Sequence, residues 1–356
     1  MSLPAPLASP ADDGTAAAAS RFPLAREGVA MALFLGFALI PVAASLGAES
    51  YVLSLATRVM IFAIAAISLD LILGYGALVS FGHAAFLGIG AYAVGILGSH
   101  GFQDTAIQLP AAILASAFFA LITGALSLRT KGVYFIMITL AFGQMAFFLA
   151  VSLAAYGGDD GMTLQVRSTL AGFAWIKGDR AFYYVVLGLL IGTYLMCRLV
   201  VRSRFGRVIR GARENAVRME AIGFSLFRHQ LVMYVLAGAV CGLAGFLLAN
   251  QTQFVSPAYM TWQRSGELIV MVVLGGIGSL HGAIIGAAAL LFLEEWLSGF
   301  TEHWKMIFGP MLVLVALFAR GGMLGAIQRF PRLASALAGW PGWLACLLAG
   351  RGAGKQ

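Results

Sequence analysis

Apolar runs of roughly bilayer length fill this chain between residues 28 and 319. An α-helix needs about 20 predominantly apolar residues to cross the hydrocarbon core of a membrane. Because a bilayer offers no water to bond the backbone, continuous runs of this kind form helices. The composition agrees, since 60% of the 356 residues are hydrophobic and only 11% are charged, against about 25% charged in soluble domains. We therefore expect an all-α polytopic membrane protein.

The runs predict about ten transmembrane helices. The third, eighth and ninth are short or rich in glycine, so each can cross fully, re-enter or break. We also expect a disordered cytoplasmic tail over 1–27, a transmembrane domain over 28–320 and a cytoplasmic tail over 321–356. The predicted spans are 28–46, 51–73, 77–97, 106–127, 132–155, 181–201, 229–251, 265–280, 282–298 and 306–319.

Lysines and arginines fall mostly on one side of this topology. With the N-terminus inside and the spans alternating, 17 of the 23 basic residues lie in the cytoplasm and 5 lie outside, Arg264 among them. Arg58 falls within a span. Cytoplasmic loops carry the excess of Lys and Arg in membrane proteins. The count predicts an even number of spans with both termini inside, and the longest external loop lies at 156–180.

A cluster of arginines follows the sixth span. Residues 202–228, which we call the basic loop, carry seven arginines and only two acidic residues, Glu214 and Glu220. A charge at the bilayer centre costs at least about 2.5 kcal/mol, so this segment must lie outside the membrane. We predict that the basic loop lies in the cytoplasm and provides a surface to which another protein can bind. A simple positive-inside anchor is the plainer alternative.

Two glycine-rich segments in the two halves of the chain look alike. Residues 73–83 and 274–282 both begin with Leu-Gly and lead into helices of small residues. Paired segments of this kind point to a pathway near the membrane midplane, although glycine-rich helices also look alike by chance. We predict broken helices here and inverted or pseudo-repeated halves. The polar residues of the two segments are candidates for lining a path: Ser80, His83, Ser279 and His281.

Asp70 and Gln144 fall inside predicted spans and complete the set of path candidates. An ionisable group at membrane depth must face the bundle interior or reach an interface, so structural pairing or an interfacial position is the plainer interpretation of Asp70. Gln144 can line a cavity or form a hydrogen bond between helices. Glu267, Glu294 and Glu295 lie near span ends, and we expect them at the membrane interface.

Catalytic chemistry is not indicated by these residues. His83 lies one turn from Ser80, but no third group or oxyanion motif accompanies the two. The three cysteines lack metal-ligand spacing. A phosphate loop ending at Gly354-Lys355 would need Gly at position 349 and Ser or Thr at position 356, where this chain has Ala349 and Gln356. We expect no enzyme activity, cofactor or metal in this chain, and any ATP is expected to bind to partner chains.

Four segments together resemble a known family. In order and spacing they are similar to the permease subunits of branched-chain amino-acid ABC importers, and to the LivM-type subunit in particular. The resemblance covers roughly residues 50–325. The segments are 74–92, 128–143, the part of the basic loop from 202 to 223, and 271–279.

The resemblance implies partners and a mechanism. A LivM-type permease pairs with a second, LivH-like permease, two LivG- and LivF-like ATPases bind ATP and Mg²⁺ on the cytoplasmic face, and a periplasmic binding protein delivers the substrate across a bacterial inner membrane. No nucleic acid takes part. The basic loop is similar to the family's coupling loop, whose short helix inserts into the ATPase, although Met219 stands where a fuller motif has alanine. The implied coupling residues are Arg213, Glu214, Glu220, Ala221 and Gly223.

The substrate is the least constrained part of this interpretation. Similar permeases serve branched-chain and other amino acids, urea, short amides or aromatic acids, and residues 131–135 also resemble the urea branch. An ion-coupled secondary transporter is a second hypothesis, with Asp70, Gln144 and Glu267 as ion or substrate ligands. A secondary transporter would take up its substrate without ATP and would stop when the ion gradient is abolished, whereas an ABC importer requires ATP.

Overall fold

The computed structural model describes residues 31–41, 49–164, 167–168, 178–299, 306 and 309–310. Within these residues the chain is almost entirely helical, and the two short strands β1 (Met162–Thr163) and β2 (Phe254–Val255) form an antiparallel pair. Both predicted terminal tails and nearly all of the tenth predicted span lie outside the described residues.

Six helices of the described part are long and apolar enough to cross a membrane. They agree within a few residues with six predicted spans, because each apolar run continues to the polar or glycine-containing turns that end it. The protein is therefore a multi-pass membrane protein. The six are α2 (Glu49–Asp70) with its π-helical end η1 (Leu71–Tyr75), α4 (Thr105–Ser127), α5 (Val133–Ser152), α6 (Asp179–Arg202), α9 (Leu226–Thr252) and α11 (Leu280–Ser298).

Two predicted spans are shorter than the sequence suggested. The third is the 17-residue helix α3 (His83–Ser99), which begins late because residues 76–82 form turns rather than helix. The eighth is the 14-residue helix α10 (Trp262–Gly275). Of the first predicted span, the structure describes the helix Met31–Pro41. Both glycine-rich segments therefore lie at helix breaks, as predicted, while the total of ten spans and the repeated halves stay predictions.

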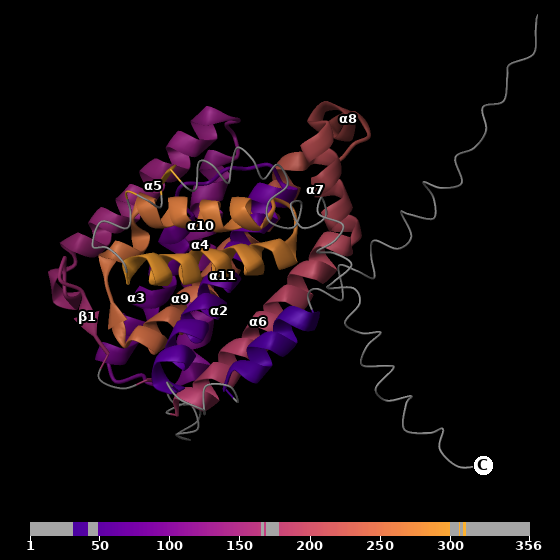
Figure 1. Ribbon diagram of the computed structural model, residues 1–356. Helices are drawn as coiled ribbons and strands as arrows, with labels where there is room; N and C mark the ends of the chain where they lie inside the picture. The colour runs from indigo at the N-terminus through magenta and orange to yellow at the C-terminus, as the bar shows by residue number, and fades with distance from the viewer. Residues whose placement is uncertain are drawn as a thin grey trace, which may run out of the picture.

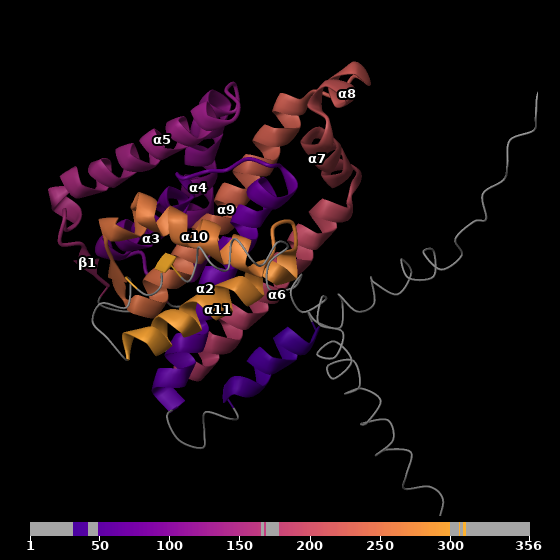
Figure 2. The same ribbon diagram turned by 45° about the horizontal axis from the view of Figure 1, so that its top comes forward.

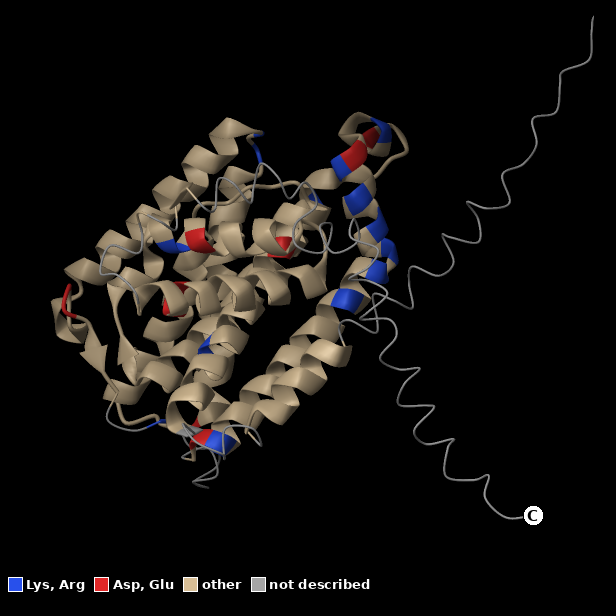
Figure 3. Cartoon of the chain, viewed as in Figure 1, with Lys and Arg blue, Asp and Glu red and all other residues tan. Residues whose placement is uncertain are grey.

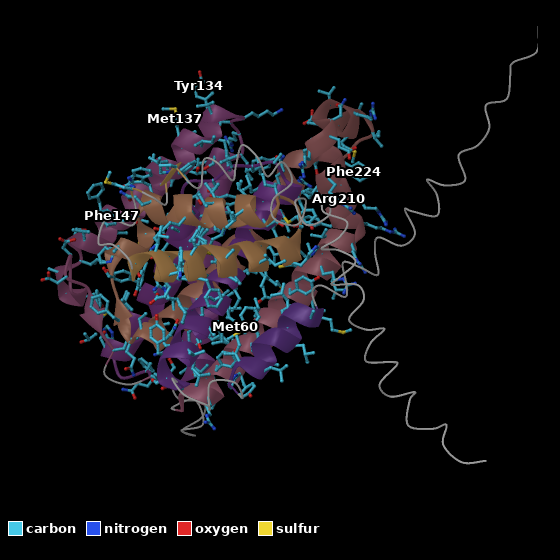
Figure 4. The ribbon with its side chains drawn as sticks, viewed as in Figure 1. Met60, Tyr134, Met137, Phe147, Arg210 and Phe224 are labelled. Atoms are coloured by element: carbon cyan, nitrogen blue, oxygen red, sulfur yellow. The ribbon has the colours of Figure 1, made fainter. Side chains whose placement is uncertain are left out.

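Helix α2 lies at the centre of the bundle. Helices α6, α9, α10 and α11 pack against it, and α3 and α4 pack against α9 (Figures 1 and 2). Its side chains from Val59 to Ile67, including Met60 (Figure 4), are almost completely buried. Helix α5 lies at the periphery, where Tyr134 and Met137 project outward (Figure 4). Such exposed apolar side chains suit contact with lipid or with another membrane subunit.

Candidate functional site

The two glycine-rich segments meet in the structure. Gly74 lies in η1 and Gly278 in the turn between α10 and α11, and a Cβ on Gly74 would come within 2.5 Å of the Gly278 nitrogen. The buried Asp70 carboxylate accepts a hydrogen bond from Gly278 N, with 2.8 Å between Oδ1 and N. The end of α2 is thus bonded to the break between α10 and α11. We call Asp70, Gly74 and Gly278 the glycine junction.

A cation from the basic loop reaches the glycine junction. Arg213 lies in the last turn of α7 (Arg204–Glu214), and its Nη1 donates a hydrogen bond to the Gly74 carbonyl oxygen. The same nitrogen lies 3.5 Å from where a Cβ on Gly278 would stand. Its positive charge also attracts the Asp70 carboxylate, which offsets part of the cost of burying that charge. The basic loop is therefore connected to both helix breaks.

The rest of the basic loop projects away from the bundle. After α7 comes the short helix α8 (Ala216–Ala221), which has no buried residue and lies at the far tip (Figure 1). Asn215 ends α7 and caps α8, since its Oδ1 accepts from Arg218 N at 2.9 Å. Gly223 then adopts φ +99°, a left-handed conformation that glycine enters without strain.

The tip of the loop combines charged and apolar exposed surface. Arginines line α7, and both signs of charge occur on α8 (Figure 3). Val217 and Ile222 expose 76% and 65% of their area, and Phe224 is exposed beside them (Figure 4). Of the predicted coupling residues, Glu214, Glu220, Ala221 and Gly223 are exposed there, whereas Arg213 turns back to the glycine junction. An exposed amphipathic tip of this kind suits insertion into a groove on a partner.

His83 belongs to a second buried cluster, where it bonds to α2. Its Nε2 lies 2.8 Å from Ser68 Oγ, and its ring meets Phe86 edge to face. The backbone nitrogen of Ala84, the next residue, donates to Ser265 Oγ of α10 at 3.1 Å. The partner of His83 is therefore Ser68 rather than Ser80, which supports the prediction of a polar helix break over that of a catalytic pair.

The remaining path candidates are not brought together in one place. Ser80 is fully buried, His281 is 6% exposed, and Ser279 Oγ donates to Gly276 O at 2.7 Å within its own turn. Gln144 is half-buried on α5. It does not line the apolar cavity of about 590 Å³ between α3, α4 and α5, although its neighbour Met145 does. A path role for these four residues stays a prediction.

Two acidic residues expected at the membrane interface lie beside arginines that approach Phe62 of α2, and all four charged side chains are partly exposed. Glu267 accepts a hydrogen bond from Arg264 at 2.5 Å, and Glu294 lies 4.0 Å from Arg58. The expectations for Glu267 and for an external Arg264 are corrected, because Arg264 lies in the first turn of α10, over a ring in the middle of α2. Hydropathy could not show this, since the segment before α10 packs along α3 instead of staying outside.

Comparison with known proteins decides the family. The family model described as "Branched-chain amino acid transport system / permease component" matches residues 51–317, about three quarters of the chain. The chain belongs to this permease family. The match spans the glycine junction and the basic loop, so both are parts of the permease domain itself.

Curated relatives of this permease include both named subunit types. The chain is 28% identical to the high-affinity branched-chain amino acid transport system permease protein LivM of Salmonella typhimurium, over 76% of this chain and 69% of that one. The same figures hold for LivM of Escherichia coli. It is 31% identical to LivH of Escherichia coli over 35% of this chain and 40% of that one. No solved structure matches the permease at a significant level. The longer match favours the LivM type.

Proposed function

We propose that this chain is the LivM-type permease of an ATP-driven importer for branched-chain amino acids. With a LivH-like permease it forms the translocation path, while two ATPase subunits hydrolyse ATP and a periplasmic binding protein delivers the substrate. The chain itself binds no cofactor and catalyses no reaction. The match to the permease family and to relatives of both subunit types supports this proposal.

The single structural observation that carries the mechanism is the reach of Arg213 into the glycine junction. The α8 tip docks on an ATPase, and ATP-driven closure of the ATPases displaces the basic loop. Arg213 passes this displacement to the ends of α2 and α10. Because rigid helices move as units about short breaks, the displacement reorients the helices around the path.

The same proposal sets the topology. The basic loop lies in the cytoplasm of a bacterium, both termini lie on that side, and the transmembrane domain of about ten helices spans residues 28–320 in the inner membrane. Tails at 1–27 and 321–356 flank it. The 17-to-5 distribution of basic residues supports this orientation.

The substrate class rests on the names of the relatives, which are branched-chain amino acid permeases. Urea, short amides or aromatic acids are the alternatives within similar permeases. A panel of these compounds, offered to the binding protein of the same system, decides between them by direct binding.

The experiment is purification and reconstitution of the complex with the charge reversal Glu220→Arg. We expect the variant to insert normally but to lose ATPase subunits on purification, with ATP-dependent L-leucine uptake reduced at least tenfold, since a groove that accepts Glu220 repels arginine. The matched control is Lys131→Glu, a charge reversal in the turn between α4 and α5, away from the α8 tip (Figures 1 and 2).

Full ATPase recovery and normal uptake with Glu220→Arg contradict the coupling role. Uptake by the wild type that needs an ion gradient and no ATP contradicts the importer itself.

A further inference from the structure

Four charged side chains gather around one buried aromatic ring of α2. The guanidinium carbons of Arg58 and Arg264 lie 5.9 and 5.8 Å from the centre of the Phe62 ring. Glu294 Oε1 is 4.0 Å from Arg58 Nη2, and Glu267 Oε2 is 2.5 Å from Arg264 Nη1. We call these four charged residues the charged cluster. Its two arginines lie over the face of the Phe62 ring. The cluster joins α2, α10 and α11.

The charged cluster lies deep in the membrane-spanning part of the chain. Phe62 is twelve residues from Ser50 and thirteen from Tyr75, the ends of its span, which is about 18 and 20 Å along a helix. The start of α10 is held at this depth, because Ser265 Oγ bonds to the first turn of α3. These charges are therefore not a solvated helix end, and charged groups at such depth mark substrate or ion pathways by default.

The charged cluster retains binding capacity on an open side. The hydrogen bond to Glu267 uses one of the five N–H groups of Arg264, and 4.0 Å between Arg58 and Glu294 exceeds hydrogen-bond length. Between 23% and 37% of each of the four side chains is exposed. A structural ion pair at this depth is expected to be closed and fully bonded, so these groups are arranged to accept a further partner.

We propose that the charged cluster binds the zwitterionic head group of the transported amino acid. Arginine guanidinium groups match a carboxylate, and glutamates match an ammonium group. The cluster carries two positive and two negative charges, so a zwitterion can exchange partners within it without adding net charge to the membrane interior. The proposal rests on the proposed function, since it assigns a place on the path to the substrate of this permease.

The first test is L-leucine uptake by the reconstituted complex with Arg264→Gln and Glu267→Gln. Each substitution removes one charge, Glu267→Gln at constant size and Arg264→Gln with loss of the guanidinium, and we expect uptake to fall about tenfold or more. Assembly with the second permease and ATP hydrolysis stimulated by loaded binding protein are expected to persist. The matched control is Arg167→Gln, which also removes an arginine paired with an acid (Asp179, 2.7 Å) over a phenylalanine ring, but at the outer end of α6.

The second test measures water access at the cluster. Glu267→Cys in the assembled complex is treated with a membrane-impermeant, positively charged thiol reagent, and Met137→Cys on the outer face of α5 is the control. We expect labelling at position 267, slowed by L-leucine with its binding protein, and no labelling at 137. The buried Cys197 and Cys241 are expected not to react, and Cys346 is replaced by serine in both variants.

The outcomes separate the two proposals. Loss of the second permease on either Gln substitution makes the cluster a subunit contact and overturns the site, as does normal uptake. No labelling at 267 means that lipid or protein covers the cluster, which also overturns it. L-leucine uptake by the wild type reports on the proposed function alone, and labelling at 267 remains informative whatever that uptake is.

Discussion

The glycine junction and the charged cluster both hold α2 against α10 and α11, but they do so in opposite ways. At the junction, glycine backbone groups bond to buried or folded-back side chains: Gly278 N donates to the Asp70 carboxylate, and Gly74 O accepts from the Arg213 guanidinium. At the cluster, long side chains meet loosely over Phe62 and remain partly exposed. Asp70, by contrast, is fully buried.

The glycine junction is therefore suited to transmit motion between helices, whereas the charged cluster is suited to bind a ligand. Backbone contacts fixed by glycine leave little freedom, so a displacement at one helix is passed to the next. Long charged side chains can change partners without any backbone movement. A permease needs both properties, and in this chain they occur at different depths along α2.

The largest expected effect comes from adding one methyl group at the junction. In Gly74→Ala the new Cβ would press on Asp70 Oδ1 and lie 2.5 Å from Gly278 N, which is backbone and cannot turn aside. Overpacking of this kind costs about 1–3 kcal/mol, to which the loss of the Asp70–Gly278 bond adds. We expect uptake to fall more than tenfold and the melting temperature of the purified complex to fall.

The control for this substitution is Gly188→Ala on α6, where a Cβ meets nothing within 4 Å. Equal uptake by the two alanine variants would show that the junction is not a close contact in the working transporter.

A smaller effect is expected at Asp70, where two substitutions separate the hydrogen bond from the charge. Asp70→Ala leaves the Gly278 amide without its acceptor, which costs about 1–3 kcal/mol. Asp70→Asn keeps an oxygen that can accept the bond but removes the charge opposite Arg213. We expect the alanine variant to melt at a lower temperature than the asparagine variant, and uptake to follow the same order.

Thermal unfolding of the purified complex and L-leucine uptake measure both variants. If asparagine is as damaging as alanine, the charge attracted to Arg213 matters more than the bond to Gly278, and the comparison between junction and cluster weakens.

Much of the architecture is predictable from local sequence. Apolar runs predicted six spans to within a few residues, since a helix boundary depends on nearby residues. The basic loop was predictable for the same reason, as were both helix breaks. These features are determined by hydropathy, charge and glycine over short stretches.

The contacts between these elements were not predictable. Asp70 and Gly278 are 208 residues apart, and no feature of the sequence near either residue indicates that the two helix breaks are in contact. Arg264 was misplaced because residues 257–260 pack against α3 and α5 instead of remaining outside, so α10 begins deeper than a hydropathy pattern suggests. Met260, for example, stands where any side chain on Gly88 would be.

The most direct test of the role of Arg213 is the ratio of L-leucine uptake to ATP hydrolysis in one reconstituted complex, with Arg213→Ala compared with wild type and Arg213→Lys. Because Arg213 joins the basic loop to Gly74, we expect the complex with Arg213→Ala to keep its ATPase subunits and to hydrolyse ATP at near wild-type rate while uptake falls about tenfold. Arg213→Lys, which keeps one donor and the charge, should recover part of the uptake. Uptake and hydrolysis that fall in the same proportion, or do not fall at all, would contradict the claim that Arg213 carries the motion.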